Sequence, residues 1–246
     1  MTPDEAALLR AVVAAPGDHL ARLVYADWLD DRGDPRGAYL RAETAAPGDR
    51  GTLVPAAAGL DAVWVARASR PPIGLCSNSV QFAGAADPAS AIDIAAAEQR
   101  IGGEFPPDYR VFLLDTGGGT PDPAHLDYPT PDPELDLEIG RFYGIPGHCE
   151  DRHRPLSECE ANREFMEYLY QVDDVLGPNP LLVGLVPIAH TLHDLGYFLI
   201  GVADDNRGRV FHFTDYCHNV DDPRHLREYA PTFAALLSRL RPDKNP

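Results

Sequence analysis

Apolar residues recur at helical spacing through the first 43 residues of the chain. The predicted first helix carries its apolar face at Leu8, Leu9, Val12 and Val13. After a Pro-Gly-Asp break, the predicted second helix carries one apolar stripe at Leu20, Leu23, Val24 and Trp28. A second break, which ends at Pro35, precedes a third helix through Tyr39 and Leu40. We therefore predict three short helices, with the stripe of the second helix buried in a small core.

The composition changes after this helical region. Residues 45–60 are rich in Ala, Gly and Pro, which weakens regular structure and suits a domain boundary. Residues 63–67 have the β-branched and aromatic content of a strand, and Pro71 and Pro72 follow them. We therefore predict a helical domain over residues 1–46 and a linker over residues 47–89 that contains one strand.

A second helical pattern begins at Ser90, which forms a capping-box sequence with Asp93. Its apolar face comprises Ile94, Ala97 and Ile101. This helix is predicted to end at Gly102, and the next one to begin at Pro106, because a first turn tolerates the missing N–H of proline. Three glycines at 117–119 are predicted to end the helix that begins at Pro106. A phosphate-binding loop is rejected, because the glycines lack the GxGxxG spacing and no Lys-Ser/Thr pair follows them.

The rest of the chain alternates short apolar runs with turn residues, the pattern of strands. The predicted strands cover residues 139–145, 181–188, 196–202 and 209–213. Helices are predicted at 157–176 and, with one apolar face, at 232–240. Residues 124–138 are acidic and Pro-rich and are predicted as a surface loop. The predicted fold class is α+β: a small helical unit, then, over residues 90–241, an antiparallel sheet packed against helices.

The chain has 246 residues and a formal net charge of −17 at pH 7. Nucleic-acid phosphates and anionic membrane surfaces attract clustered Lys and Arg, so this balance argues against both as the principal partner. The same charge would steer a basic protein toward the chain, although it could equally be a solubilising surface. We therefore predict a protein partner, with no nucleic acid and no membrane.

Two features concern the cellular compartment. No apolar run approaches the roughly 20 residues that span a bilayer, and Asp4 and Glu5 lie where a secretory leader would carry positive charge. The cysteines have neither a CxxC pair nor the spacing of a disulfide framework: Cys76, Cys149, Cys159 and Cys217. We predict a cytoplasmic protein with reduced thiols.

Candidate catalytic chemistry is sparse. His190, His193 and His212 could supply zinc ligands, but no HExxH glutamate accompanies them, and structural or surface histidines are the preferred interpretation. Asp136 and Glu138 could do acid–base work, but carboxylates in acidic loops are usually solvated. No nucleophile elbow is present. We therefore predict no catalytic residue, no metal ligand and no cofactor.

Several segments together resemble the SUKH superfamily, which includes Smi/Knr-type cell-wall regulators and bacterial immunity proteins. They are residues 94–119, then FYGIPG, LVPIAH, GYFLIGV, GRVFHF and APTFAALLSRL, in that order. The resemblance implies an α+β domain that binds other proteins, in bacteria often a secreted toxin neutralised in the cytosol. Residues 18–34, with DEAALLRAV before them and YLRAE after them, closely resemble the bacterial repeat-companion domain, with which no established activity comes.

We therefore predict a non-catalytic protein-binding chain, and a SUKH-type immunity protein that neutralises a toxin, such as a basic nuclease, is the preferred interpretation. The alternatives are a general intracellular interaction or regulatory module and a metal-dependent enzyme that uses the His190, His193 and His212 region. Candidates for a charged binding rim, which could also be merely solvated turn residues, are Asp204, Asp205, Asp215, Asp221 and Asp222.

Overall fold

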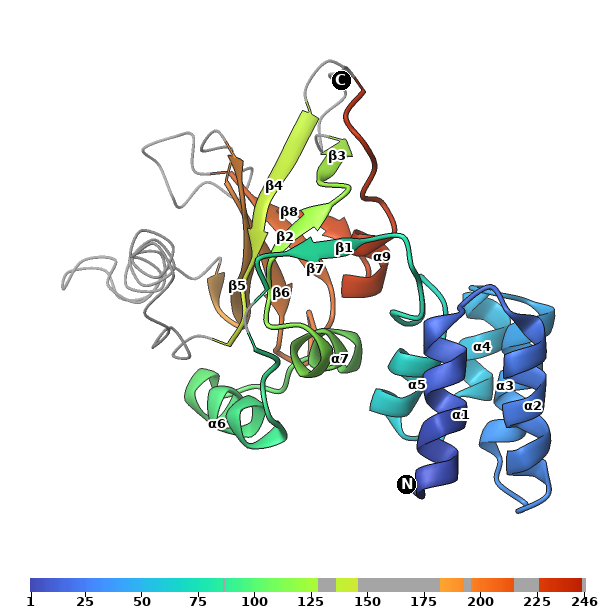
Figure 1. Cartoon of the computed structure of the whole chain (residues 1–246). Coiled ribbons are helices and arrows are strands. Elements are labelled where there is room, and N and C mark those ends of the chain that lie inside the picture. The colour runs from blue at the N-terminus through green and yellow to red at the C-terminus, as the bar shows by residue number, and fades with distance from the viewer. Residues whose placement is uncertain (86, 128–135, 146–181, 193–195, 215–225, 245–246) are drawn as a thin grey trace.

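The computed structural model describes residues 1–85, 87–127, 136–145, 182–192, 196–214 and 226–244 (Figure 1). The helices in this part of the chain are α1 (Pro3–Ala14), α2 (His19–Asp30), α3 (Arg36–Ala45), α4 (Arg50–Ala56), α5 (Ala62–Ala68), α6 (Ala91–Ile101), α7 (Pro107–Asp115) and α9 (Phe233–Leu237). The strands are β1 (Gln81–Ala83), β2 (Thr120–Asp122), β3 (His125–Asp127), β4 (Asp136–Phe142), β5 (Leu185–Thr191), β6 (Tyr197–Gly201), β7 (Val210–Phe213) and β8 (Leu226–Ala230). The predicted helix at 157–176 lies outside the described residues.

Helices α1–α5 form a bundle beside the α+β part of the chain (Figure 1). The three predicted helices are confirmed as α1, α2 and α3, but the predicted strand at 63–67 is wrong, because α5 occupies this segment. The Asp61 side chain caps α5 by accepting a hydrogen bond of 2.6 Å from the Trp64 N–H. Trp64 and Val65 then pack into the same core as Leu9. Tertiary packing and a local cap therefore override the β propensity of these residues.

The rotation of α2 also differs from the prediction. The side chains of Leu20 and Val24 are 69% and 46% exposed, so the predicted stripe is not the buried one. The face of α2 that points inward carries Tyr25, Ala26, Leu29 and the fully buried Arg22. Nη1 of Arg22 lies 2.8 Å from the buried Glu43 carboxylate, off the line of a hydrogen bond, and donates to the Ala68 carbonyl oxygen at 2.7 Å. A buried charge needs such partners, which only this orientation of α2 supplies.

In the described residues, strands β3 to β8 form one antiparallel sheet in chain order, and β1 pairs with β2 in a separate ladder. An isolated β-bridge between Gly119, just before β2, and Phe142 of β4 joins the β1–β2 pair to the large sheet. The face of the sheet that packs on α6, α7 and α9 carries Val186, Phe198, Ile200 and Val210. The opposite face carries a second buried cluster with Leu185, Leu199 and Phe213. The α+β prediction is confirmed.

Local signals position α6 and α7 as predicted. The hydroxyl of Ser90 accepts from the Asp93 N–H at 3.2 Å, and the Asp93 carboxylate accepts from the Ser90 N–H at 2.9 Å. Helix α6 ends at Gly102, whose φ of 69° is in the left-handed region that favours glycine. Residues 124–138, in contrast, were predicted as a loop and contain β3 and the start of β4. Pairing between these two strands accounts for the difference.

The sheet curls so strongly that its first and last strands approach each other. The Tyr229 hydroxyl on β8 donates a hydrogen bond to the Asp127 carbonyl oxygen on β3. The segment after α9 crosses the same region, where Arg241 and His125 exchange two backbone hydrogen bonds of 3.0 and 3.1 Å. We call this region, formed by His125, Asp127, Asp136, Tyr229 and residues 239–244, the seam.

Candidate functional site

The histidines proposed as zinc ligands do not converge. On β5, His190 is opposite Tyr197 of β6, whereas His212 of β7 is opposite Phe198. Because neighbouring residues of a strand point to opposite faces, His190 and His212 lie on different faces of the sheet. They cannot bind one metal ion. His193 lies outside the described residues.

Each of these two histidines has a structural environment. Nδ1 of His190 lies 3.1 Å from the Tyr143 hydroxyl, and the two rings stack with centroids 5.6 Å apart. His212 is buried on the helix-covered face, where its ring lies 5.1 Å from that of Phe198. These contacts favour the interpretation of both residues as parts of the packed sheet.

The acidic turn between β6 and β7 projects from the sheet. Asp204 has a side chain that is 99% exposed, and Asp205 is also exposed. Arg207 lies 3.0 Å from the Asp204 carboxylate and 3.3 Å from that of Glu104. The other three rim candidates, Asp215, Asp221 and Asp222, lie outside the described residues. The turn therefore places two of the five candidates at the surface, where a partner could reach them.

Asp136 and Glu138 have no arrangement suited to acid–base catalysis. Asp136 lies in the seam, where the guanidinium of Arg241 forms an ion pair with one carboxylate oxygen. Glu138 is opposite His125 on β3. Each of the two carboxylates therefore faces a basic or imidazole side chain and not the other carboxylate.

A pocket of about 490 Å³ lies where the segment after α5 passes over α7 and α9. Its apolar lining includes Leu75, Val80, Phe82, Phe112 and Leu237, and its polar lining includes Ser77, Ser79, Asp115 and Ser238. A volume of this size is ordinary for a ligand or side-chain binding site. Sequence reasoning missed this pocket because three separate segments build it.

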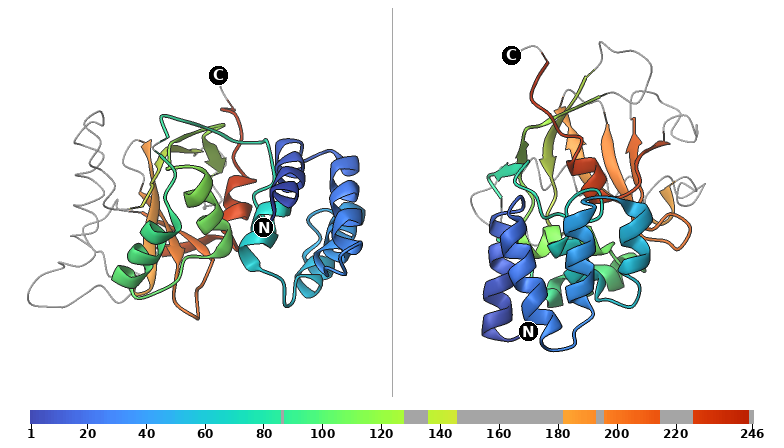
Figure 2. Two further views of the ribbon diagram at one scale, coloured as in Figure 1. Left: turned by 60° about the horizontal axis from the view of Figure 1, so that its bottom comes forward. Right: turned by 90° about the vertical axis from the view of Figure 1, so that its right-hand side faces the viewer.

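Two contacts hold the helical bundle beside this pocket. The guanidinium of Arg67 on α5 binds the Asp115 carboxylate at the end of α7 through hydrogen bonds of 2.6 and 3.3 Å. The Thr232 hydroxyl, just before α9, donates to the Pro72 carbonyl oxygen at 3.0 Å. Figure 2 shows α5 as the bundle helix next to α7 and α9. Both contacts adjoin the pocket, because Asp115 and Pro71 belong to its lining.

The buried Asp108 fixes α9 against α7. Its carboxylate accepts hydrogen bonds from the Ala234 N–H at 2.9 Å and from the Tyr109 N–H at 3.0 Å. Burial raises the pKa of Asp108, while these N–H donors act in the opposite direction. The carboxylate thus supplies hydrogen bonds at the start of α9, which forms one wall of the pocket.

Acidic residues are concentrated in the second part of the chain. Residues 1–80 contain 10 acidic and 8 basic residues, whereas residues 81–246 contain 28 acidic and 13 basic residues. Nearly all of the net negative charge therefore belongs to the part that contains the sheet. A single-sign charge of this kind creates a field that acts over about a Debye length of 8–10 Å.

These features define a helical unit followed by an α+β domain with a curled antiparallel sheet. A family model, the SMI1 / KNR4 family (SUKH-1), matches residues 88–239, and the chain belongs to this family. The predicted superfamily is confirmed. No curated protein matches the chain. Within the described residues, the helices are too short or too polar to cross a membrane.

Proposed function

We propose that this protein is a SUKH-type immunity protein that binds and neutralises a basic toxin protein in the cytosol. Membership of the SMI1 / KNR4 family (SUKH-1) is the observation that carries the proposal, since members of this family are often immunity proteins. The excess of 28 acidic over 13 basic residues in 81–246 supports a basic partner. The resemblance of the N-terminal unit to the repeat-companion domain remains a prediction.

Charge and apolar contact have different roles in this proposal. The acidic field would raise the association rate with a basic protein, and the exposed Asp204 and Asp205 would form part of the contact rim. Most of the affinity would come from a few desolvated side chains at the centre of the interface. The apolar lining of the pocket, with Val80 and Phe82 partly exposed, is a second candidate region for such a contact.

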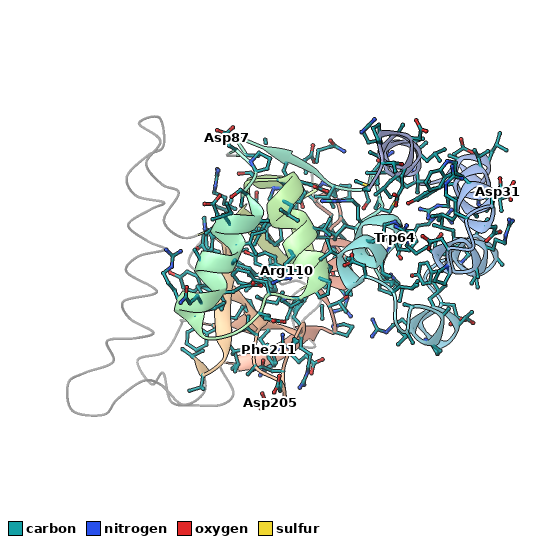
Figure 3. All side chains as sticks on the ribbon, turned by 90° about the horizontal axis from the view of Figure 1, so that it is seen from below. Asp31, Trp64, Asp87, Arg110, Asp205 and Phe211 are labelled. Carbon is teal, nitrogen blue, oxygen red and sulfur yellow. The ribbon has the colours of Figure 1, made fainter. Side chains whose placement is uncertain are left out.

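The test is co-expression of the full chain with the protein product of the neighbouring gene, followed by measurement of cell survival and of complex formation. The Asp204→Lys/Asp205→Lys variant should lower the association rate by about tenfold or more at low salt, with a smaller effect at high salt. A matched control is Asp4→Lys/Asp31→Lys, which makes the same charge change on the helical bundle. Asp31 and Asp205 lie far apart in Figure 3.

A Ser79→Arg variant tests the pocket separately, because the new side chain would block it without changing the turn. Loss of binding in this variant alone would locate the contact at the pocket. No survival and no complex with any adjacent gene product would contradict the immunity proposal. Equal loss in both charge-reversal variants would contradict a specific role of the acidic turn.

A general interaction module remains the second candidate function, and the outward face of α2 favours it. Leu20 and Val24 are exposed one helical turn apart and could contact another protein. Loss of partner binding in the Leu20→Ser/Val24→Ser variant, with binding retained in the Asp204→Lys/Asp205→Lys variant, would support this module. Because Leu75 and Val80 pack against the sheet domain while Cys76 belongs to the bundle core, these variants are better tested in the full chain than in separated halves.

A further inference from the structure

Three side chains that can bind a metal ion meet at the seam. His125 comes from β3, Asp136 from β4 and Asp243 from the segment after α9. One ligand atom from each residue lies within 4.8 Å of the other two. This is a mixed imidazole and carboxylate set brought together by tertiary structure, and imidazole with carboxylate is a donor set that divalent transition metals accept.

The geometry of His125 suits a ligand better than a hydrogen bond. Its Nδ1 lies 3.5 Å from Oδ2 of Asp136. Tetrahedral zinc with bonds of about 2.1 Å separates neighbouring ligand atoms by about 3.4 Å, close to the observed spacing. The Nδ1 atom is buried and has no hydrogen-bond partner among the described residues, and the side chain as a whole is 19% exposed. This nitrogen therefore faces the Asp136 carboxylate and not water.

The surrounding contacts would orient these ligands. Arg241 pairs with Oδ1 of Asp136, so that Oδ2 faces His125. Metal-binding carboxylates commonly receive such a second contact. The backbone pairing of Arg241 with His125 brings Asp243, two residues further on, to the same place. The neighbouring Asp127 carboxylate is in turn paired with Arg241 and Lys244.

We propose that His125, Asp136 and Asp243 bind one divalent transition-metal ion, with Zn²⁺ as the best match, and that water completes its coordination. The ion would fix the C-terminal segment against β3 and β4 and would stabilise the seam. The role proposed for the ion is structural, because none of the three ligands lines the pocket or belongs to the acidic turn. This site is independent of the proposed toxin binding and differs from the histidines that the sequence indicated.

Isothermal titration of the full chain with ZnCl₂, combined with thermal unfolding in Zn²⁺ and in EDTA, tests the proposal. We expect one ion per chain and a midpoint of unfolding that rises with Zn²⁺ and returns with EDTA, because a ligand that binds only the folded state stabilises it. The variants His125→Ala and Asp136→Asn should abolish this binding. Asp243→Asn should weaken it by about tenfold or more.

Matched controls are His19→Ala and Asp204→Asn, which change an exposed histidine and an exposed aspartate elsewhere. Both should bind Zn²⁺ like the unchanged chain. If the unchanged chain binds no stoichiometric ion, or if Asp243→Asn and His125→Ala bind as tightly as the controls, the site does not exist. Because Asp243 is exposed near the end of the chain, its variant remains informative even if His125→Ala fails to fold.

Discussion

The hydroxyl of Tyr229 donates a hydrogen bond of 2.7 Å to the carbonyl oxygen of Asp127, a residue 102 positions earlier in the chain. Tyr229 is on the last strand of the sheet and Asp127 on the first, so this bond closes the curl of the sheet. Arg239 donates to the Tyr229 carbonyl oxygen and Arg241 pairs with Asp127, which adds two contacts from the C-terminal segment.

Replacement of Tyr229 by phenylalanine tests how much this hydrogen bond contributes to the free energy of unfolding. We expect Tyr229→Phe to lower the free energy of unfolding by about 1 kcal/mol, the typical net value of one hydrogen bond. Urea denaturation monitored by circular dichroism measures this difference.

The pH dependence of this variant is a second consequence of the same environment. Burial raises the pKa of Tyr229 to about 12. A pKa above that of the unfolded chain means that stability is fully present below pH 10 and is lost as the pH rises toward 12. Tyr229→Phe should lose less stability than the unchanged chain over this interval. Parallel curves for the two proteins between pH 9 and about 12 would contradict the assignment.

Asp108 provides a prediction about α9. Asp108→Ala removes the acceptor of the Ala234 and Tyr109 N–H groups and should cost about 2 kcal/mol, the upper range for a lost helix cap. Asp108→Asn keeps an acceptor and should cost less. Burial raises the pKa of Asp108, so stability is greatest below the unfolded pKa and falls as the pH rises through the folded value.

The comparison of Asp108→Asn with the unchanged chain isolates this ionisation. The unchanged chain should gain stability relative to Asp108→Asn as the pH is lowered through the folded pKa of Asp108. Denaturation curves at several acidic pH values measure the difference. A relative loss for the unchanged chain on acidification would show that the N–H donors outweigh burial and that the pKa is lowered instead.

The two faces of α2 should respond differently to substitution. Leu20→Ser/Val24→Ser changes exposed side chains and should alter the free energy of unfolding by no more than about 0.5 kcal/mol per site. Leu29→Ala, on the buried face, should cost about 2–5 kcal/mol because it leaves a cavity. Chemical denaturation distinguishes the two. A larger loss of stability in Leu20→Ser/Val24→Ser than in Leu29→Ala would indicate that the face with Leu20 and Val24 is the buried one, as the periodicity predicted.

Gly118 occupies a position that other residues should not tolerate. Its φ is 83°, and an added Cβ would lie 2.5 Å from the Phe142 carbonyl oxygen. Gly118→Ala should therefore cost more than about 2 kcal/mol, from backbone strain and overpacking together. Gly17→Ala is the control, because no atom lies within 4 Å of its added Cβ. Equal stability of the two variants in thermal unfolding would contradict this role of Gly118.

Features that depend on a few neighbouring residues could be predicted from the sequence. The capping box of Ser90 and Asp93, the end of α6 at Gly102 and the strands around 196–202 and 209–213 were predicted correctly, as were the α+β class and the superfamily. The exposed position of Asp204 also followed from its turn sequence. Each of these features is determined by residues within one helical turn or one strand, so the local sequence is enough to predict it.

Features that depend on distant partners required the tertiary structure. Residues 63–67 have strand composition, but packing against the α1 and α2 side chains stabilises a helix there. Helix α2 has two faces with apolar residues, and the buried ion pair of Arg22 with Glu43 determines which of them points into the core. The pocket and the cluster of His125 with Asp136 and Asp243 arise only where separate segments meet. Burial and ion pairing act between residues close in space, and the spacing of residues along a chain does not specify which of them become neighbours.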